Sequence, residues 1–293
     1  MGPGPTDRPG PENIMVRVRV VTDSTADMDE AEASALGISI VPLNVHWNGD
    51  TYLDKVELST DDFYRKLKEE KGTPRTSQPS VGQFEDVYRR LLRESDSILS
   101  VHISSKLSGT LNSAAIAAKQ VVSDRIKVVD SLTTTYPLGV IALRTARAAR
   151  DGAGLAECEE LARRLIPRVK LVAAVDTLEY LRRGGRIGRA QAFAGTLLSI
   201  KLVFHLEGGV VEPVDRVRTR TATIKRTAEF AAQLGDVEEM AVLYGDNPQP
   251  ALELAHLLSS ARPGIQLGLG RIGPVLGAHT GPGVYGVGLV LPE

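Results

Sequence analysis

Hydrophobic and polar positions alternate along the first half of the chain in blocks that predict strands, each followed by a helix. The segment VRVRVVTDSTADM predicts a strand over residues 16–21, with Asp23, Ser24 and Thr25 at its carboxyl end. Further extended segments are predicted at residues 38–47, 97–103 and 126–130, and helices at about 29–36, 60–71, 81–94, 109–122 and 133–168. Strands that alternate with helices indicate a doubly wound parallel sheet, here over residues 15–168.

The pattern changes after Arg168, and the more irregular segments that follow indicate a second α/β domain over residues 169–293. Two alternating stretches flank Gly208-Gly209 and predict a β-hairpin over 201–217. Other strands are predicted from 171 and at 239–245, 265–273 and 284–291, with helices at 219–234 and 250–261. These elements predict a mixed sheet. The Pro/Gly-rich leader over residues 1–14 is expected to be disordered.

Composition narrows the class of protein. A chain of 293 residues suits two domains, and its formal net charge of −1 provides no global field to recruit nucleic acid or an anionic membrane. Cys158 is the single cysteine, which excludes an intramolecular disulfide and favours a reducing, cytoplasmic location. No apolar run approaches the ~20 residues that a membrane span requires.

Hydroxyl groups crowd around one glycine where a predicted strand stops, in the stretch VHISSKLSGTLNSA over residues 101–114. Ligands of open parallel sheets bind at the carboxyl ends of strands, and the start of a helix offers unpaired N–H groups. Ser108 and Gly109 therefore form a candidate anion site. The alternative is that Ser108 only caps the helix that follows.

Two more segments are candidates for the same site. Thr76 and Ser77 lie in the predicted loop GTPRTSQPS, which two prolines stiffen, although a plain turn would have the same composition. His279 and Thr280 lie in the glycine-rich segment GAHTGPGVYGVG, where the backbone can approach a ligand closely and a histidine can donate to an oxyanion. A lone histidine on a loop can equally be structural.

The segment RRGGRIGR, residues 182–189, carries four arginines around a glycine pair. Arginine at such a position can bind a phosphate or an acidic partner, or it can belong to a solvated face. The segment GLGRIG, residues 268–273, matches a dinucleotide fingerprint, but Pro274 follows and too few residues remain for the rest of that motif. The five histidines show no metal-ligand spacing, so neither a metal site nor a cofactor is expected.

Taken in order, the motifs VTDSTADM, TSQPS, SSKLSGT, LEYLRRGGRIG and GAHTGPGVYGVG resemble those of the DegV family, over about residues 16–291. The resemblance implies a two-domain fold that holds a long-chain fatty acid between the domains. The better-understood members are acyl-binding subunits of bacterial fatty acid kinase, which present the carboxylate for acyl phosphate formation and have no turnover of their own. One departure is Leu202, where the family often has proline, which leaves the local strand start and the route of the acyl tail open.

Carried over by motif, the resemblance implies that Thr76 and Ser108 bind the carboxylate and that His279 lies beside them, with Ser77, Gly109 and Thr280 as neighbours in the same motifs. It implies that Arg183 and Arg186 face the kinase subunit, and it is compatible with transient membrane contact. The apolar stretch AFAGTLLSI, residues 192–200, is a candidate for tail contacts.

The physical chemistry of the ligand agrees with this reading. Burial of ~14 methylenes at about 0.8 kcal/mol each gives roughly 11 kcal/mol, before ordering costs of several kcal/mol. The carboxylate still needs hydrogen-bond donors, and two hydroxyls, a helix start and a histidine can supply them. The alternative function is an acyl hydrolase or transferase that uses Ser108 and His279, although the chain has no G-x-S-x-G elbow.

Overall fold

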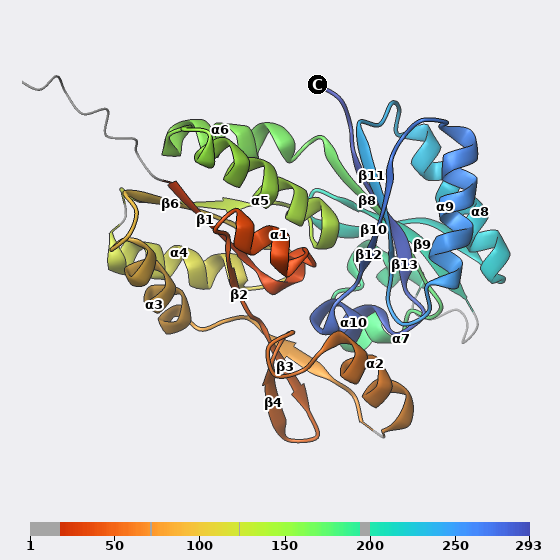
Figure 1. Ribbon diagram of the computed structural model, residues 1–293. Helices are drawn as coiled ribbons and strands as arrows, with labels where there is room; N and C mark the ends of the chain where they lie inside the picture. The colour runs from red at the N-terminus through yellow and green to blue at the C-terminus, as the bar shows by residue number, and fades with distance from the viewer. Residues whose placement is uncertain (1–17, 71, 123, 194–199) are drawn as a thin grey trace, which may run out of the picture.

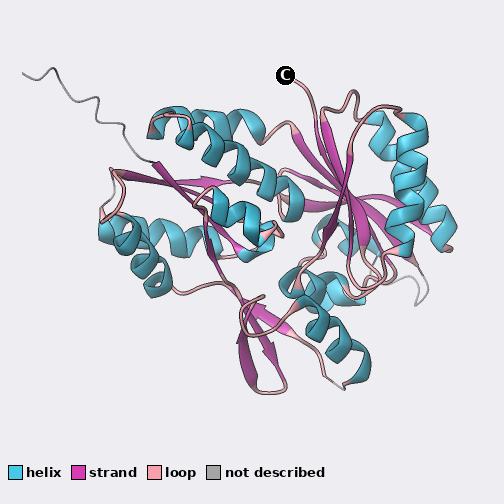
Figure 2. Ribbon diagram, in the orientation of Figure 1, coloured by secondary structure: helices cyan, strands magenta, loops and turns pink. Residues whose placement is uncertain are grey.

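The structure is a computed structural model that describes residues 18–70, 72–122, 124–193 and 200–293. Three sheets and the helices around them make up the fold (Figure 1, Figure 2). The predicted leader over 1–14 and most of the apolar stretch 192–200 lie outside the described residues.

The first sheet is parallel throughout and has the strand order β2-β1-β6-β7. Its strands are β1 (Val18–Asp23), β2 (Ser39–Val41), β6 (Ser97–His102) and β7 (Ile126–Asp130). Val20 and Leu99 pack toward one face, and Val21 and Ile98 toward the other. Both faces are therefore apolar, as the near-continuous hydrophobic runs predicted.

Helices cover both faces of this sheet, which confirms the doubly wound prediction (Figure 1). One face is covered by α1 (Glu30–Ala35), α5 (Thr135–Arg150) and α6 (Leu155–Leu165), and the other by α3 (Val81–Leu91) and α4 (Thr110–Val121). A short 3-10 helix, η1 (Ser24–Ala26), follows β1. The region predicted as helical over 133–168 contains two helices. The backbone leaves the helical conformation between α5 and α6, at Gly152, which has a φ of 103°.

The second sheet is mixed, as predicted, with the order β10-β9-β8-β13-β11-β12. Its strands are β8 (Val169–Val175), β9 (Lys201–Glu207), β10 (Val210–Val217), β11 (Glu239–Tyr244), β12 (Leu267–Arg271) and β13 (Tyr285–Val290). Only β11 and β12 are parallel neighbours. The helices α8 (Arg220–Gln233) and α9 (Gln249–Ala261) cover one face, and the other face is lined by a separate apolar cluster that includes Leu171, Phe204 and Leu243.

A third, small sheet was not predicted. It is antiparallel and contains β3 (Asn44–Trp47), β4 (Asp50–Leu53) and β5 (Arg75–Ser77). The prediction of a loop over 72–80 is therefore wrong for β5, which pairs with β3 far away in the sequence. This sheet packs with α2 (Thr60–Glu69) and with α10 (Pro274–Thr280), so a segment near the C-terminus joins a core built from residues 43–64.

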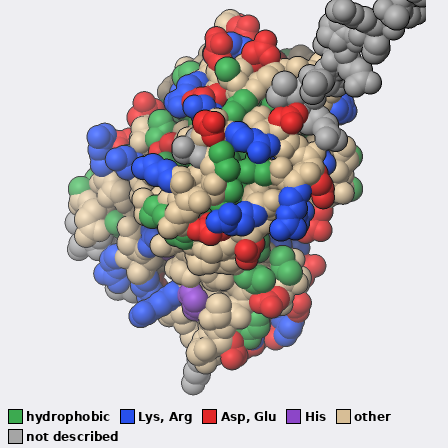
Figure 3. Space-filling view, turned by 90° about the vertical axis from the view of Figure 1, so that its left-hand side faces the viewer, with side chains coloured by type: hydrophobic (Ala, Val, Ile, Leu, Met, Phe, Trp, Pro, Cys, Tyr) green, Lys and Arg blue, Asp and Glu red, His purple; other side chains and the backbone are tan. Residues whose placement is uncertain are grey.

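Four remaining features bear on the predictions. The strand start at Leu202 is intact, because β9 begins at Lys201 and Leu202 is fully buried. The described residues also include the short elements α7 (Glu179–Arg183) and η2 (Gly188–Phe193). None of the helices in the described ranges is long and apolar enough to cross a membrane. Acidic and basic side chains are interspersed over the face shown in Figure 3, in keeping with the small net charge.

The segment GLGRIG does form the start of a strand–helix–strand unit, made by β12, α10 and β13. The expectation that too few residues remained for a helix and a second strand is wrong on this point. Nevertheless β12 lies at the sheet edge and β13 runs antiparallel to β11, so the unit is not the parallel crossover that a dinucleotide fingerprint requires.

Candidate functional site

An apolar pocket lies between the inner face of the second sheet and the loops at the carboxyl ends of the first. The empty space in this region, together with the solvent at its open mouth, amounts to about 850 Å³. The sheet contributes Leu171, Ala173, Phe204, Leu206, Val211 and Leu243. Other apolar walls come from Ile103, Leu107, Ile272, Val275 and Leu276. Polar side chains from five distant segments of sequence also line the pocket, at residues 76–78, 108, 134–135, 186 and 279–280.

Thr76 and Ser77 both line the pocket, but their hydroxyls have different partners. Thr76 pairs with Val45 across β3 and faces α10, where its Oγ1 lies 2.7 Å from Nε2 of His279. The Ser77 hydroxyl instead contacts Nε2 of His46 at 2.9 Å and accepts from the Asn44 amide at 3.2 Å. Ser77 therefore ties β5 to β3, whereas Thr76 belongs to the site.

His279 lies in the last turn of α10, not in a glycine-rich loop as its sequence context predicted. Burial, with the Arg186 charge as a second cause, lowers the pKa of the ring to about 4, so the imidazole is neutral near pH 7. Nδ1 is buried and has no hydrogen-bond partner among the described residues. Because an unpaired buried N–H is costlier than an unpaired acceptor, the favoured tautomer carries its proton on Nε2 and donates it to Thr76. The Thr76 hydroxyl proton is then free to point into the pocket.

Ser108 and Gly109 lie where α4 begins. Gly109 is the N-cap, and the Ser108 Oγ accepts from the backbone N–H of Thr110 at 3.3 Å and contacts its hydroxyl at 2.8 Å. A Cβ added to Gly109 would lie 3.1 Å from the amide of Gln78, so glycine lets the loop after β5 approach the helix start. Ser108 therefore has both of the roles considered above. Its Oγ accepts a hydrogen bond at the start of α4, and its side chain also lines the pocket.

Arg186 links these segments. Its Nε donates to the Leu107 carbonyl at 2.8 Å, next to Ser108, and Nη1 donates to the Gly184 carbonyl at 2.6 Å. Arg186, Thr76 and His279 line both the pocket and a polar outer hollow. Arg186 was expected to face a partner, and the structure places it at the boundary between these two spaces, so its partner contact stays a prediction.

The outer hollow is basic at its rim. Besides the three shared residues it is lined by Arg75, Arg183, Thr73 and Tyr180. Arg183 is exposed, pairs with Glu179 on its own helix and donates to the Thr73 hydroxyl at 3.3 Å. The hollow thus offers positive charge just outside the polar end of the pocket.

Thr280, the last predicted residue, lines the pocket but donates its hydroxyl to the Leu276 carbonyl at 2.9 Å, within α10. The site that the structure assembles therefore consists of Thr76, His279, Ser108 and Arg186, with Gln78 as a neighbour that the sequence did not single out. Gln78 carried no separate signal, since it lay inside a segment that resembled an ordinary turn.

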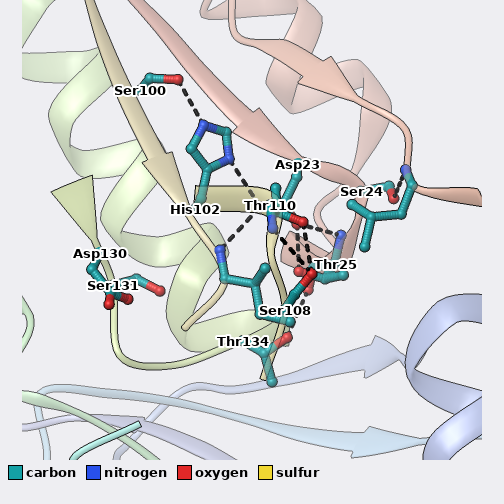
Figure 4. A network of polar contacts seen from close by, with 12 residues as sticks. Asp23, Ser24, Thr25, Ser100, His102, Ser108, Thr110, Asp130, Ser131 and Thr134 are labelled. Carbon is teal, nitrogen blue, oxygen red and sulfur yellow. Dashed lines mark hydrogen bonds and ion pairs between the residues drawn. The ribbon is translucent and has the colours of Figure 1, made fainter. Parts of the chain in front are cut away.

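A buried polar network beneath the site was also missed (Figure 4). Tyr88 contacts Ser100 at 2.8 Å, Ser100 contacts Nε2 of His102 at 2.7 Å, and Nδ1 of His102 contacts Asp23 at 3.0 Å. The same carboxylate accepts from the Ile103 N–H at 3.0 Å. Although this resembles a serine–histidine–aspartate arrangement, Ser100 and His102 are 0% exposed and no substrate reaches them. The network joins the carboxyl ends of β1 and β6.

The alternative of a Ser108–His279 hydrolase lacks its central contact in the described part of the chain. Nε2 of His279 is engaged with Thr76, and the Ser108 hydroxyl is engaged with Thr110. A histidine that activates a serine must lie within hydrogen-bond reach of it, and a third group normally orients the ring. No group of three His, Cys, Asp or Glu side chains among the described residues is placed to hold a metal ion.

Comparison with known proteins identifies the family. Residues 17–291 match the family model described as uncharacterised protein, DegV family. The chain belongs to the DegV family. Among curated relatives, a DegV domain-containing protein of Streptomyces coelicolor is 38% identical, over 92% of this chain and 97% of the relative. Protein DegV of Bacillus subtilis is 33% identical, over 93% and 98% respectively.

Solved DegV structures have the same fold. A DegV family protein from Thermus thermophilus, described as fatty acid binding, superposes with a TM-score of 0.86 at 35% identity, over 94% of this chain and all 100% of that one. DegV of Bacillus subtilis, described as a fatty acid binding protein, gives a TM-score of 0.85 at 31% identity, over 94% and 100%. DegV family proteins thus bind fatty acids in structures, and the two-domain α/β fold predicted for this chain is confirmed.

Proposed function

We propose that this protein binds one long-chain fatty acid, with the acyl tail in the apolar pocket and the carboxylate at Thr76, Ser108 and His279. The observation that carries the proposal is the pairing of an otherwise apolar pocket with a linked polar group at its mouth, made by the Thr76–His279 contact and by Arg186 beside Ser108. The fatty acid binding described for the Thermus thermophilus and Bacillus subtilis proteins supports it.

The electrostatics of the mouth suit a carboxylate. His279 is neutral, so the donors are two hydroxyls, with the Arg186 guanidinium nearby to offset the negative charge. The start of α4 adds the positive end of a helix dipole. A fatty alcohol or a methyl ester keeps the tail but lacks the charge, so both should bind more weakly than the acid.

We further propose that the bound carboxylate is presented to a kinase subunit. A carboxylate oxygen attacks the γ-phosphorus of ATP held by that partner, the bond to the β-phosphate oxygen breaks, and ADP leaves with the electron pair. The outer hollow supports this step, because it reaches Thr76 and His279 from outside and carries Arg75 and Arg183 at its rim. In this proposal the chain itself turns nothing over, and the boundary between its two domains falls near residues 168 and 169.

The binding proposal is tested by titrating delipidated protein with palmitate, methyl palmitate and hexadecanol. Palmitate should bind at one molecule per chain and at least about tenfold more tightly than the other two, since charged hydrogen bonds contribute ~1.5–3 kcal/mol each. Equal affinity for the three ligands would remove the carboxylate from the proposed site. Absence of binding for all three would refute the function.

A further inference from the structure

A buried charged cluster lies at the C-terminal end of η1, and the proposed function does not use it. It consists of Asp27 at the end of η1 and of Asp54 and Lys55 in the turn after β4. Lys55 forms an ion pair with Asp27 and donates to the Ser24 carbonyl at 2.9 Å. The Asp27 side chain and Asp54 are each only 2% exposed.

Stability alone gives no reason for this cluster. Lys55 forms an ion pair with Asp27 but none with Asp54, so among the described residues the Asp54 carboxylate has no cation in direct contact. Burial accordingly raises the pKa of Asp54 to about 7. Asp27 and Lys55 are also non-glycine residues in the left-handed region, with φ of 48° and 63°. Buried charges are often no more stable than apolar residues of the same size, and strained backbone persists where surrounding contacts hold it.

The cluster holds the start of α10. The Asp27 Oδ1 accepts from the Gly273 N–H at 3.0 Å, and Gly273 is the N-cap of α10. A Cβ on Gly273 would lie 2.4 Å from Cε of Lys55 and 2.7 Å from Asp27 Oδ1, so any side chain there would have to displace these two groups. Just before it, the Ile272 carbonyl accepts from the Tyr64 hydroxyl at 3.0 Å.

The same segment forms one wall of the acyl pocket. Its pocket-lining residues are Ile272, Val275, Leu276, His279 and Thr280. The helix has only seven residues, about 10 Å, so a shift at its start reaches His279 with little damping. Lys55 is also connected to a second part of the wall through Ser24. Lys55 binds the Ser24 carbonyl, and the Ser24 hydroxyl accepts a hydrogen bond from the Leu43 N–H at 3.1 Å. Leu43 lines the pocket.

We propose that Asp27, held by Lys55, is a positioning residue for the head-group site, because it fixes the start of α10 and so keeps His279 against Thr76. This inference rests on the proposed function for its effect on fatty acid binding, but the hold on α10 can be measured without any ligand.

Two substitutions of Asp27 separate its roles. Both glycine and asparagine suit the left-handed backbone at this position. Asp27→Gly removes the oxygen that accepts from Gly273, whereas Asp27→Asn keeps an acceptor there and removes only the negative charge that pairs with Lys55. Gly273→Ala is an independent variant, because its methyl group pushes the Lys55 and Asp27 side chains away while both residues keep their identity. Glu239→Gln is the matched control, since it weakens partly buried contacts to Tyr136 and Arg144 away from α10.

Amide hydrogen exchange of residues 275–281 in ligand-free protein tests the hold on α10. Exchange should rise about tenfold in Asp27→Gly and Gly273→Ala, and should stay near wild type in Asp27→Asn and Glu239→Gln. In the same two variants palmitate affinity should fall about tenfold while hexadecanol affinity stays within about twofold. A general loss of packing would lower both affinities equally.

Unchanged α10 exchange in Asp27→Gly and Gly273→Ala would overturn the proposal, as would equal losses for palmitate and hexadecanol. Failure of Asp27→Asn to restore protection would also contradict it, because the acceptor to Gly273 would then not be the group that matters. If the wild-type protein bound no palmitate, the proposed function would fall, while the exchange data would still decide whether Asp27 holds α10.

Discussion

Replacement of Thr76 by valine tests the head-group site most selectively, because the side chain keeps its shape and loses only the hydroxyl. In the structure that hydroxyl lies 2.7 Å from Nε2 of His279, and the favoured tautomer leaves its proton free for the ligand. A hydrogen bond to a charged group contributes ~1.5–3 kcal/mol, so palmitate should bind about 10- to 150-fold more weakly. Methyl palmitate, which presents no charge, should lose much less.

The same substitution leaves the His279 Nε2–H buried without an acceptor. An unsatisfied buried donor costs ~1–3 kcal/mol, so the free energy of unfolding of the ligand-free protein should also decrease by about that amount. Urea unfolding measures this loss separately from binding.

The control for Thr76→Val is Thr134→Val. Thr134 lines the same pocket, but its hydroxyl donates to the Thr25 carbonyl at 3.4 Å and is not part of the Thr76–His279 contact. Its replacement should change palmitate and methyl palmitate affinities alike. The assay is displacement of a fluorescent fatty acid from delipidated protein at fixed pH and salt. An equal loss for acid and ester in Thr76→Val would refute the reasoning, since the hydroxyl would then only shape the pocket.

Three further predictions concern charge. Arg183→Ala should leave palmitate affinity unchanged, because Arg183 is exposed on the outer hollow. It should lower partner-dependent acyl phosphate formation, measured as the hydroxamate. Loss of palmitate binding in this variant would place Arg183 in the lipid site instead. The pKa of Asp54 is raised to about 7, so the free energy of unfolding should fall as pH rises from about 4 to about 7, by on the order of 4 kcal/mol. Asp54→Asn should remove this fall, which urea unfolding measures. The pKa of His279 is lowered to about 4, so the free energy of unfolding should fall as pH falls from about 6.5 to about 4, and His279→Gln should abolish that loss. If the pH dependence of stability were unchanged in Asp54→Asn or in His279→Gln, the burial argument for that residue would be contradicted.

The periodic parts of the fold were predictable from sequence. The runs that became β1, β6 and β7 are apolar on both faces, and the intervening helices carry clear start signals such as the capping box at Ser80 and Gln83. The hairpin over 201–217 followed from Gly208-Gly209, both of which have positive φ. These signals are local, so a single sequence contains them.

Elements that depend on distant contacts were not predictable. The strand β5 lies in a segment rich in Pro and Gly, and it exists because Asn44, Val45 and His46 pair with it. The helix α10 is short and contains Gly277, and its start is held by Asp27 and Tyr64, which are more than 200 residues away in sequence. Tertiary contacts override weak local propensity at both places.

The candidate site divides in the same way. Motif order brought out Thr76, Ser108 and His279, and the structure brings all three to one pocket. The sequence did not show that His279 contacts Thr76, that Arg186 lies at the pocket boundary, or that Asp54 and Lys55 form a buried cluster with Asp27. Each of these facts depends on the packing of segments from both halves of the chain.

Native mass spectrometry of the intact protein tests the central claim most directly. Protein as purified, and delipidated protein after addition of palmitate, should each carry an extra mass equal to one long-chain fatty acid per chain. Lipid extraction should return that acid unmodified. A protein that carries no acyl ligand as purified and gains no mass from added palmitate would contradict the account.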